Sequence, residues 1–123
     1  MATWSYTLSV PHDPRASRVA RDTLRSALTV AGQDALVDVA TLLASEVVGN
    51  AYRHTSGNAL IRMRSAGGLL RVSVWDAEPG LPRHLDVDEG STHGRGLMLL
   101  DACADRWGVR SLGRAKSVWF EVS

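Results

Sequence analysis

Residues 34–54 read DALVDVATLLASEVVGNAYRH, the stretch with the clearest helical period in this chain. Apolar residues recur there at three- and four-residue steps, as on the buried side of an α-helix. The clearest of them are Leu36, Ala40, Leu43 and Val47. The run Thr55-Ser-Gly-Asn58 interrupts the pattern, since such residues favour turns. We therefore expect a helix from about Asp34 to His54 that lies with one side on the core.

Strand patterns surround this helix. Residues 4–10 alternate apolar side chains with Thr and Ser, the period-two pattern of a strand with one buried face. Two more strand-like runs, 59–65 and 69–76, meet across Gly67-Gly68, which marks a tight hairpin. The remaining expected elements are a helix from an Asp13 cap and Pro14 to Gly32, a helix over 96–107, and strands over 107–112 and 117–122 joined by a turn at 113–115.

The order of these elements predicts one α+β domain over residues 1–123. Short connections between successive strands favour antiparallel pairing. The helices can all cover one face of the sheet. The expected architecture is a two-layer α/β sandwich with helices on one face of a mixed, mostly antiparallel sheet.

Composition narrows the classes of function. Fourteen Lys and Arg against thirteen Asp and Glu leave a net charge of +1, which disfavours a direct nucleic-acid partner. The single cysteine, Cys103, has no partner for an internal disulfide and fits a reducing compartment. The N-terminal residues lack the basic start and apolar run of a signal peptide. We expect a cytoplasmic protein without a membrane span.

Polar residues crowd the end of the 34–54 helix. Glu46 and Asn50 are one turn apart, about 40° from each other around the axis, and both border the apolar stripe. A carboxylate there can take a proton, and an amide oxygen can ligate Mg²⁺. Arg53 and His54 follow on the last turn. The same spacing also fits a surface glutamate followed by helix-terminal Asn and His residues.

Two other segments carry candidate binding residues. Asp76 ends an apolar strand just before Pro79-Gly80, where it could accept a hydrogen bond from an exocyclic amine or merely cap a turn. Gly80 would let the backbone approach a flat ring. Gly94 to Leu97 carry a glycine pair at a helix start, which suits a phosphate but equally a hinge. Arg95 would either reach the phosphates or solvate the loop.

Together the three segments resemble the motifs of the GHKL ATPases, the family of gyrase, histidine-kinase and anti-sigma-factor ATPases. Glu46-x-x-x-Asn50-Ala-x-x-His54 is similar to the N box, Asp76-x-x-Pro-Gly80 to the first glycine box and Gly94-Arg-Gly96-Leu to the second. The run over 94–108 and the ending Lys116-Ser-Val-Trp-Phe-Glu are most similar to stand-alone anti-sigma-factor serine kinases. The resemblance covers nearly the whole chain.

The resemblance implies a Bergerat-type sandwich that binds Mg²⁺-ATP. Asn50 would ligate magnesium and Asp76 would bind the adenine amine. Glu46 would be the general base toward a serine or threonine hydroxyl of an anti-anti-sigma protein. In this reading Gly80 admits the base, Gly94, Arg95, Gly96 and Leu97 wrap the phosphates, Arg53 and His54 are weaker phosphate candidates, and Ser117 supports the adenine contact.

One residue departs from the family pattern. Glu78 stands where the first box usually has its first glycine, so it could reshape the adenine pocket or repel phosphates. The first two readings left by the resemblance are a kinase that also binds a sigma factor and a partner-binding module that turns over little or no ATP. A detached catalytic domain of a histidine kinase is a third. The resemblance also implies a possible homodimer.

Overall fold

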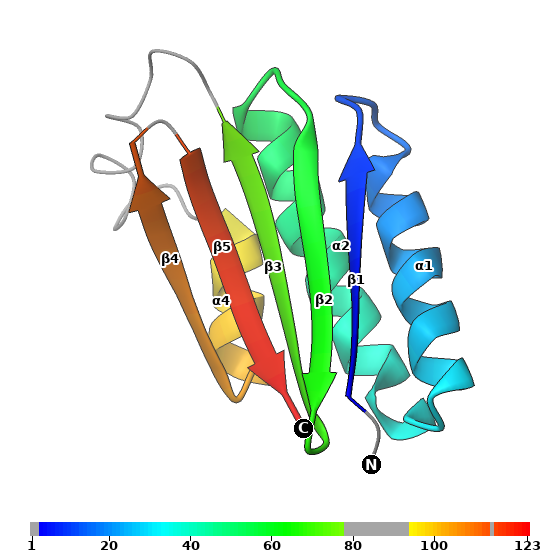
Figure 1. Cartoon of the computed structure of the whole chain (residues 1–123). Helices are drawn as coiled ribbons and strands as arrows, with labels where there is room; N and C mark the ends of the chain where they lie inside the picture. Colours follow the sequence, from blue (N-terminus) through cyan, green and yellow to red (C-terminus); the bar gives the residue numbers. More distant parts are fainter. Residues whose placement is uncertain (1–2, 78–93, 114) are drawn as a thin grey trace.

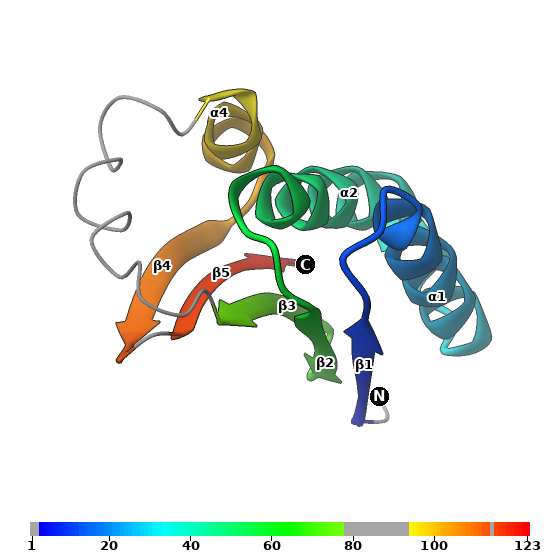
Figure 2. The same cartoon turned by 90° about the horizontal axis from the view of Figure 1, so that it is seen from above.

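The computed structural model describes residues 3–77, 94–113 and 115–123. A five-stranded sheet forms one layer, and the described helices lie together on one of its faces (Figures 1 and 2). In chain order the elements are β1 (Trp4–Val10), α1 (Ala16–Val30), a 3₁₀ turn (Asp34–Leu36), α2 (Val37–His54), β2 (Ala59–Ala66), β3 (Leu69–Ala77), α4 (Gly94–Cys103), β4 (Arg106–Leu112) and β5 (Ala115–Val122). The predicted two-layer α+β sandwich is confirmed.

The strands are ordered β1-β2-β3-β5-β4, and every pairing among them is antiparallel. The expectation of a mixed sheet is therefore wrong. The fourth strand, β4, lies at the edge of the sheet. The chain then turns back into β5, which lies between β4 and β3 and pairs antiparallel with both. The predicted hairpin between β2 and β3 is confirmed: Gly67 and Gly68 have φ angles of 58° and 83°. Two successive positive φ angles are what a two-residue type I′ turn requires.

The core lies between the sheet and the helices. Side chains alternate between the two faces of each strand, so every second residue points at the helices. Ile61, Val72 and Phe120 are fully buried on that face. The helices meet them with Leu24 and Leu43, also fully buried. Each such side chain contributes about 1.5–3 kcal/mol when it leaves water.

The helix α2 occupies the middle of the helical layer, between α1 and α4 (Figure 2). By length and composition alone, Asp34–His54 could also cross a membrane, with a mean hydropathy of 1.2. Its apolar residues instead pack on the sheet and the neighbouring helices, as in the central helix of a globular domain. This placement leaves the two flanks of α2 facing different neighbours.

Two helices begin or end away from the expected residues. The first helix begins at Ala16, because the Asp13 side chain binds the segment before it. Its Oδ1 accepts the Arg15 backbone N–H at 2.7 Å, and its carbonyl oxygen accepts the Ala16 N–H at 3.0 Å. Hydrogen bonds from the Arg15 side chain and backbone lower the pKa of Asp13 from 3.8 to about 2. The helix expected to reach Trp107 ends at Cys103, since Trp107 pairs with Phe120 in the sheet.

Candidate functional site

The C-terminal half of α2 carries Glu46 and Asn50 on one flank, and both are half-buried. The opposite flank faces α1: the Ser17 hydroxyl donates to the Ser45 carbonyl oxygen at 3.3 Å, and Gly49 lies beside Ser17. Each helical residue turns about 100° from the last, which carries Glu46 and Asn50 away from α1. Figure 2 shows α4 on the other side of α2 from α1, so a residue turned away from α1 on this flank lies toward α4.

Asp76 lies near the end of β3 on the helix-facing side of the sheet. It pairs in register with Ala59 on β2 and Lys116 on β5, and its residue exposure is only 6%. Val72 and Val74, which share its face, belong to the core. Burying a carboxylate is costly unless the group is hydrogen-bonded or paired. Asp76 is a buried polar group on a face of β3 whose neighbours Val72 and Val74 are apolar.

Gly94, Arg95, Gly96 and Leu97 form the first turn of α4. The first N–H groups of a helix have no partner within it, and the helix dipole makes this end attractive to anions. The predicted glycine pair thus lies inside the helix start. Figure 1 shows that the carboxyl ends of α2 and β3 and the amino end of α4 point toward the same end of the molecule. The elements bearing the three candidate motifs therefore converge.

Arg53 and His54 are both exposed on the last turn of α2. The Arg53 guanidinium reaches back to Gly49, where an added Cβ would lie 3.4 Å from it. The Arg53 side chain thus lies along the surface of the last turns of α2, one turn after Asn50. Glu78 and Gly80, in the box that departs from the family pattern, lie outside the described residues.

The structure does not bring Ser117 to Asp76. Ser117 pairs with Trp75, and the neighbouring Lys116 pairs with Asp76. Because side chains alternate along a strand, Ser117 points to the face without helices. Its exposure is 1%, and within the described residues its hydroxyl has no hydrogen-bond partner. Lys116 is the β5 residue on the Asp76 side, and the alternation with buried Val118 could have identified it from the sequence.

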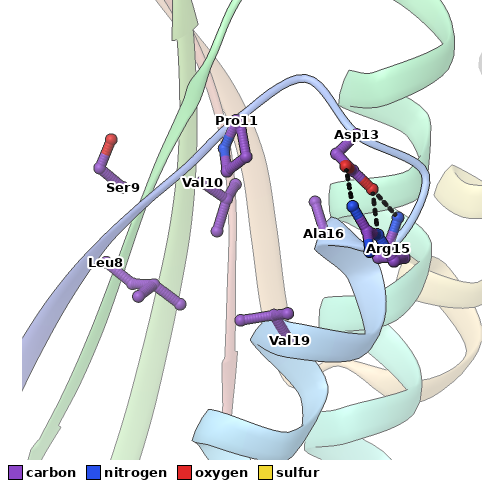
Figure 3. A pocket seen from close by; sticks show the side chains of 8 residues that line it. All are labelled: Leu8, Ser9, Val10, Pro11, Asp13, Arg15, Ala16 and Val19. Carbon is purple, nitrogen blue, oxygen red and sulfur yellow. Dashed lines mark hydrogen bonds and ion pairs between the residues drawn. The ribbon is translucent and has the colours of Figure 1, made fainter.

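Two hollows open near the strand ends. One, of about 260 Å³, borders Asp76 and lies among the ends of four strands. The other, of about 280 Å³, lies between β1 and the start of α1 (Figure 3). Its walls are mostly apolar, from Leu8, Val10 and Val19, and the Asp13 and Arg15 side chains at its rim bind each other. No α2 residue lines this second hollow, which therefore does not include Glu46 or Asn50.

The next question is whether the described side chains could ligate Mg²⁺. Mg²⁺ commonly takes one or two protein oxygens and completes its shell with water and phosphate oxygens. No three His, Cys, Asp or Glu side chains of the described residues form a metal-binding group. The half-buried Asn50 fits the role of a single protein ligand to a cation that arrives with a nucleotide.

The sequence is similar to a known family and to a known protein. A sequence profile described as "Histidine kinase-like ATPase domain" matches residues 10–121. An uncharacterized protein of Streptomyces coelicolor is 47% identical over 53 residues, which are 42% of this chain and 50% of that protein. The matched part is thus half the length of that relative.

A likeness of fold extends over more of the chain. The crystal structure of the RsbU and RsbW domains of Rv1364c from Mycobacterium tuberculosis matches with a TM-score of 0.74 and 20% identity. The match covers 96% of this chain and 32% of that one, so it concerns about a third of the solved chain. At this identity the likeness is one of fold.

Proposed function

Because this chain belongs to the family of histidine kinase-like ATPase domains, we propose that it binds Mg²⁺-ATP and acts as an anti-sigma factor with serine/threonine kinase activity. Its substrate in this proposal is an anti-anti-sigma protein, and its second partner is a sigma factor. The observation that carries the proposal is the buried Asp76, which faces the helices at the end of the molecule where α2 ends and α4 begins. The family match and the fold support it.

In the proposed site each element has one task. Asp76 accepts a hydrogen bond from the exocyclic amine of adenine, which selects that base in a region withheld from water. The first turn of α4, from Gly94 to Leu97, donates backbone N–H groups to phosphate oxygens. Gly80 next to the base and Arg95 at the phosphates extend this proposal to the rest of the family motif.

Asn50 and Glu46 serve the transfer itself. Bound Mg²⁺-ATP supplies the phosphoryl group, and the cation neutralises its charge. Asn50 offers its amide oxygen to the cation. Glu46, one turn earlier and half-buried, accepts the proton of the attacking serine or threonine hydroxyl. A half-buried carboxylate suits this task because the hydroxyl comes from another protein and must reach it from solvent.

A partner-binding module with little turnover is the second candidate. It is favoured by Glu78, an acidic residue where the family motif has glycine. In that case the fold and the sigma-binding surface would act without phosphoryl transfer. Separate measurements of nucleotide binding and of phosphoryl transfer distinguish this candidate from the kinase.

Thermal unfolding with nucleotide tests the proposal. We expect saturating Mg²⁺-ATP to raise the melting temperature, because a ligand that binds only the folded state stabilises it by roughly 2.7 kcal/mol at 100 times its Kd. Asn50→Ala should remove most of this rise. Asp38→Ala, an exposed change at the other end of α2, is the matched control and should keep it. An unchanged melting temperature in the wild-type protein would overturn the proposal.

A further inference from the structure

The face of the sheet without helices carries rows of side chains that the nucleotide site does not use. Figure 1 views the molecule from this side, with the helices behind the strands. Register places Arg64, Arg71, Glu121 and Arg106 side by side across β2, β3, β5 and β4. The next row holds Arg62, Ser73, Trp119 and Gly108, and the third holds Leu60, Trp75, Ser117 and Arg110. We call the arginines of these rows the arginine face: Arg62, Arg64, Arg71, Arg106 and Arg110.

The arginine face is short of acidic partners. Glu121 is the acid on this face among the described strand residues, and it contacts Arg71 at 3.0 Å and Arg106 at 3.6 Å. Arg64 pairs directly with Arg71, although like charges in direct register destabilise a sheet. Within the described residues Arg62, Arg64 and Arg110 form no ion pair, and all three are exposed. The face keeps an uncompensated positive charge.

This charge is segregated from the rest of the chain. Five arginines and one glutamate leave an excess of four positive charges on the face, whereas the whole chain carries only +1. The remainder of the chain is therefore acidic on balance. A face of this kind is not a by-product of a basic composition.

Trp119 forms a fixed apolar centre among these charges. The Arg71 guanidinium lies 4.0 Å from the centroid of its ring and that of Arg106 lies 5.8 Å away. An added Cβ at Gly108 would come within 2.9 Å of three atoms of the indole, so the ring lies close against β4. The aliphatic side chains of Leu60 and Leu69, exposed by 44% and 39%, lie on the same face. The surface thus combines arginines with apolar contacts.

We propose that the arginine face docks an acidic, amphipathic helix of a partner protein. Neighbouring strands are about 4.8 Å apart, and carboxylates three or four residues apart on a helix rise by about 4.5–6 Å. A helix laid across the strands can therefore present successive carboxylates to Arg64 and Arg71, which lie on neighbouring strands. Its apolar residues would contact Trp119 and Leu60.

Other occupants fit this face less well. A second copy placed face to face would set arginines against arginines, which opposes association. A nucleic acid would gain nothing from the exposed leucines, and the rest of the chain, which is acidic on balance, would repel its phosphates. The proposal does not depend on nucleotide binding, because the face lies on the side of the sheet away from the helices.

Fluorescence anisotropy with synthetic peptides tests the proposal on the full chain without nucleotide. The probe is a labelled helical peptide with glutamates three and four residues apart beside a leucine stripe, and its partner peptide has glutamine at every glutamate. We expect the glutamate peptide alone to bind. The double variant Arg62→Gln/Arg64→Gln should weaken binding roughly fivefold or more, as loss of exposed ion pairs predicts.

The control is Arg18→Gln/Arg25→Gln, which removes the same charge from the exposed surface of α1. It should leave peptide affinity within about twofold. Equal weakening by both double variants, or equal binding of the two peptides, would overturn the proposal. So would tighter binding of a DNA duplex that depends on Arg62 and Arg64, or a change in sedimentation showing that this face joins two copies. Unfolding midpoints of both double variants verify that they fold.

Discussion

Glu46 and Asp76 are both carboxylates of the proposed site, yet they differ in their access to water. Glu46 is half-buried on α2, while Asp76 is 6% exposed on β3. A buried acceptor can discriminate between ligands, since a mismatched group would leave it without its hydrogen bond. A residue at the border of solvent can meet a hydroxyl of another protein. This difference in exposure supports the two roles proposed for these residues.

Replacing Glu46 by Gln tests its role as general base. The amide keeps the size of the side chain and loses the ability to take the proton, so nucleotide binding should persist while transfer to the protein substrate falls by about 10²–10⁴-fold. Transfer of labelled phosphate from ATP, measured beside the nucleotide-induced melting shift, separates the two effects. A variant that phosphorylates its partner at the wild-type rate would exclude Glu46 as the base.

Gly108 is a packing position that the sequence motifs do not mark. A methyl group there would lie 2.9 Å from the Trp119 ring, so Gly108→Ala must displace the ring or the strand. We expect a loss of about 1–3 kcal/mol in the free energy of unfolding in urea. Gly49→Ala is the control, because its Cβ would meet only contacts of 3.4 Å within a helix and should be neutral or slightly stabilising. Equal stabilities would contradict the account of Trp119.

For residues on strands, the alternation of apolar residues predicts which face of the sheet each site residue occupies. The apolar residues Val72 and Val74 fix the face of Asp76, and Val118 and Phe120 fix that of Lys116. The family resemblance indicates Ser117 for the adenine contact, whereas the strand alternation places it on the other face. Arg53 could not be placed because a long, exposed side chain follows local contacts that no sequence period specifies.

At the scale of elements, the hairpin between β2 and β3 was predictable because its turn depends on local backbone chemistry. Gly67 and Gly68 both have positive φ angles, which glycine adopts without a steric cost. The ends of α1 and α4 were not predictable to the residue. Asp13 binds the Arg15 N–H in place of capping the helix directly, and Trp107 is drawn into the sheet beside Phe120. Both outcomes depend on contacts beyond the local pattern.

Substitutions in this turn test the element directly. Gly68→Val should destabilise the protein by roughly 1–2 kcal/mol, because a β-branched residue is strained at positive φ. Gly67→Asn should be tolerated, since asparagine at the first central position followed by glycine is the preferred type I′ pair. Urea unfolding midpoints compare the two. A tolerated valine at Gly68 would contradict the described turn.

For the whole molecule, composition and element order were enough to predict two layers and one helical face. They did not exclude a parallel pair, because the order of strands depends on how the chain crosses between β3 and β4. The wholly antiparallel order places β5 between β3 and β4 and brings Lys116 opposite Asp76. The same order assembles the arginine face from β2, β3 and β4, which no linear motif could reveal.

The nucleotide site is the central claim at this scale, since it requires α2, β3 and α4 to act on one ligand. Calorimetric titration of Mg²⁺-ATP and Mg²⁺-GTP into the wild-type protein and Asp76→Asn tests it most directly, with Ser117→Ala as the control on the opposite face. We expect the wild type and Ser117→Ala to bind ATP in preference to GTP, because guanine has a carbonyl oxygen where adenine has its amine. Asp76→Asn should lose about tenfold or more in ATP affinity. Equal binding of ATP and GTP by the wild type, or unchanged ATP affinity in Asp76→Asn, would contradict the account.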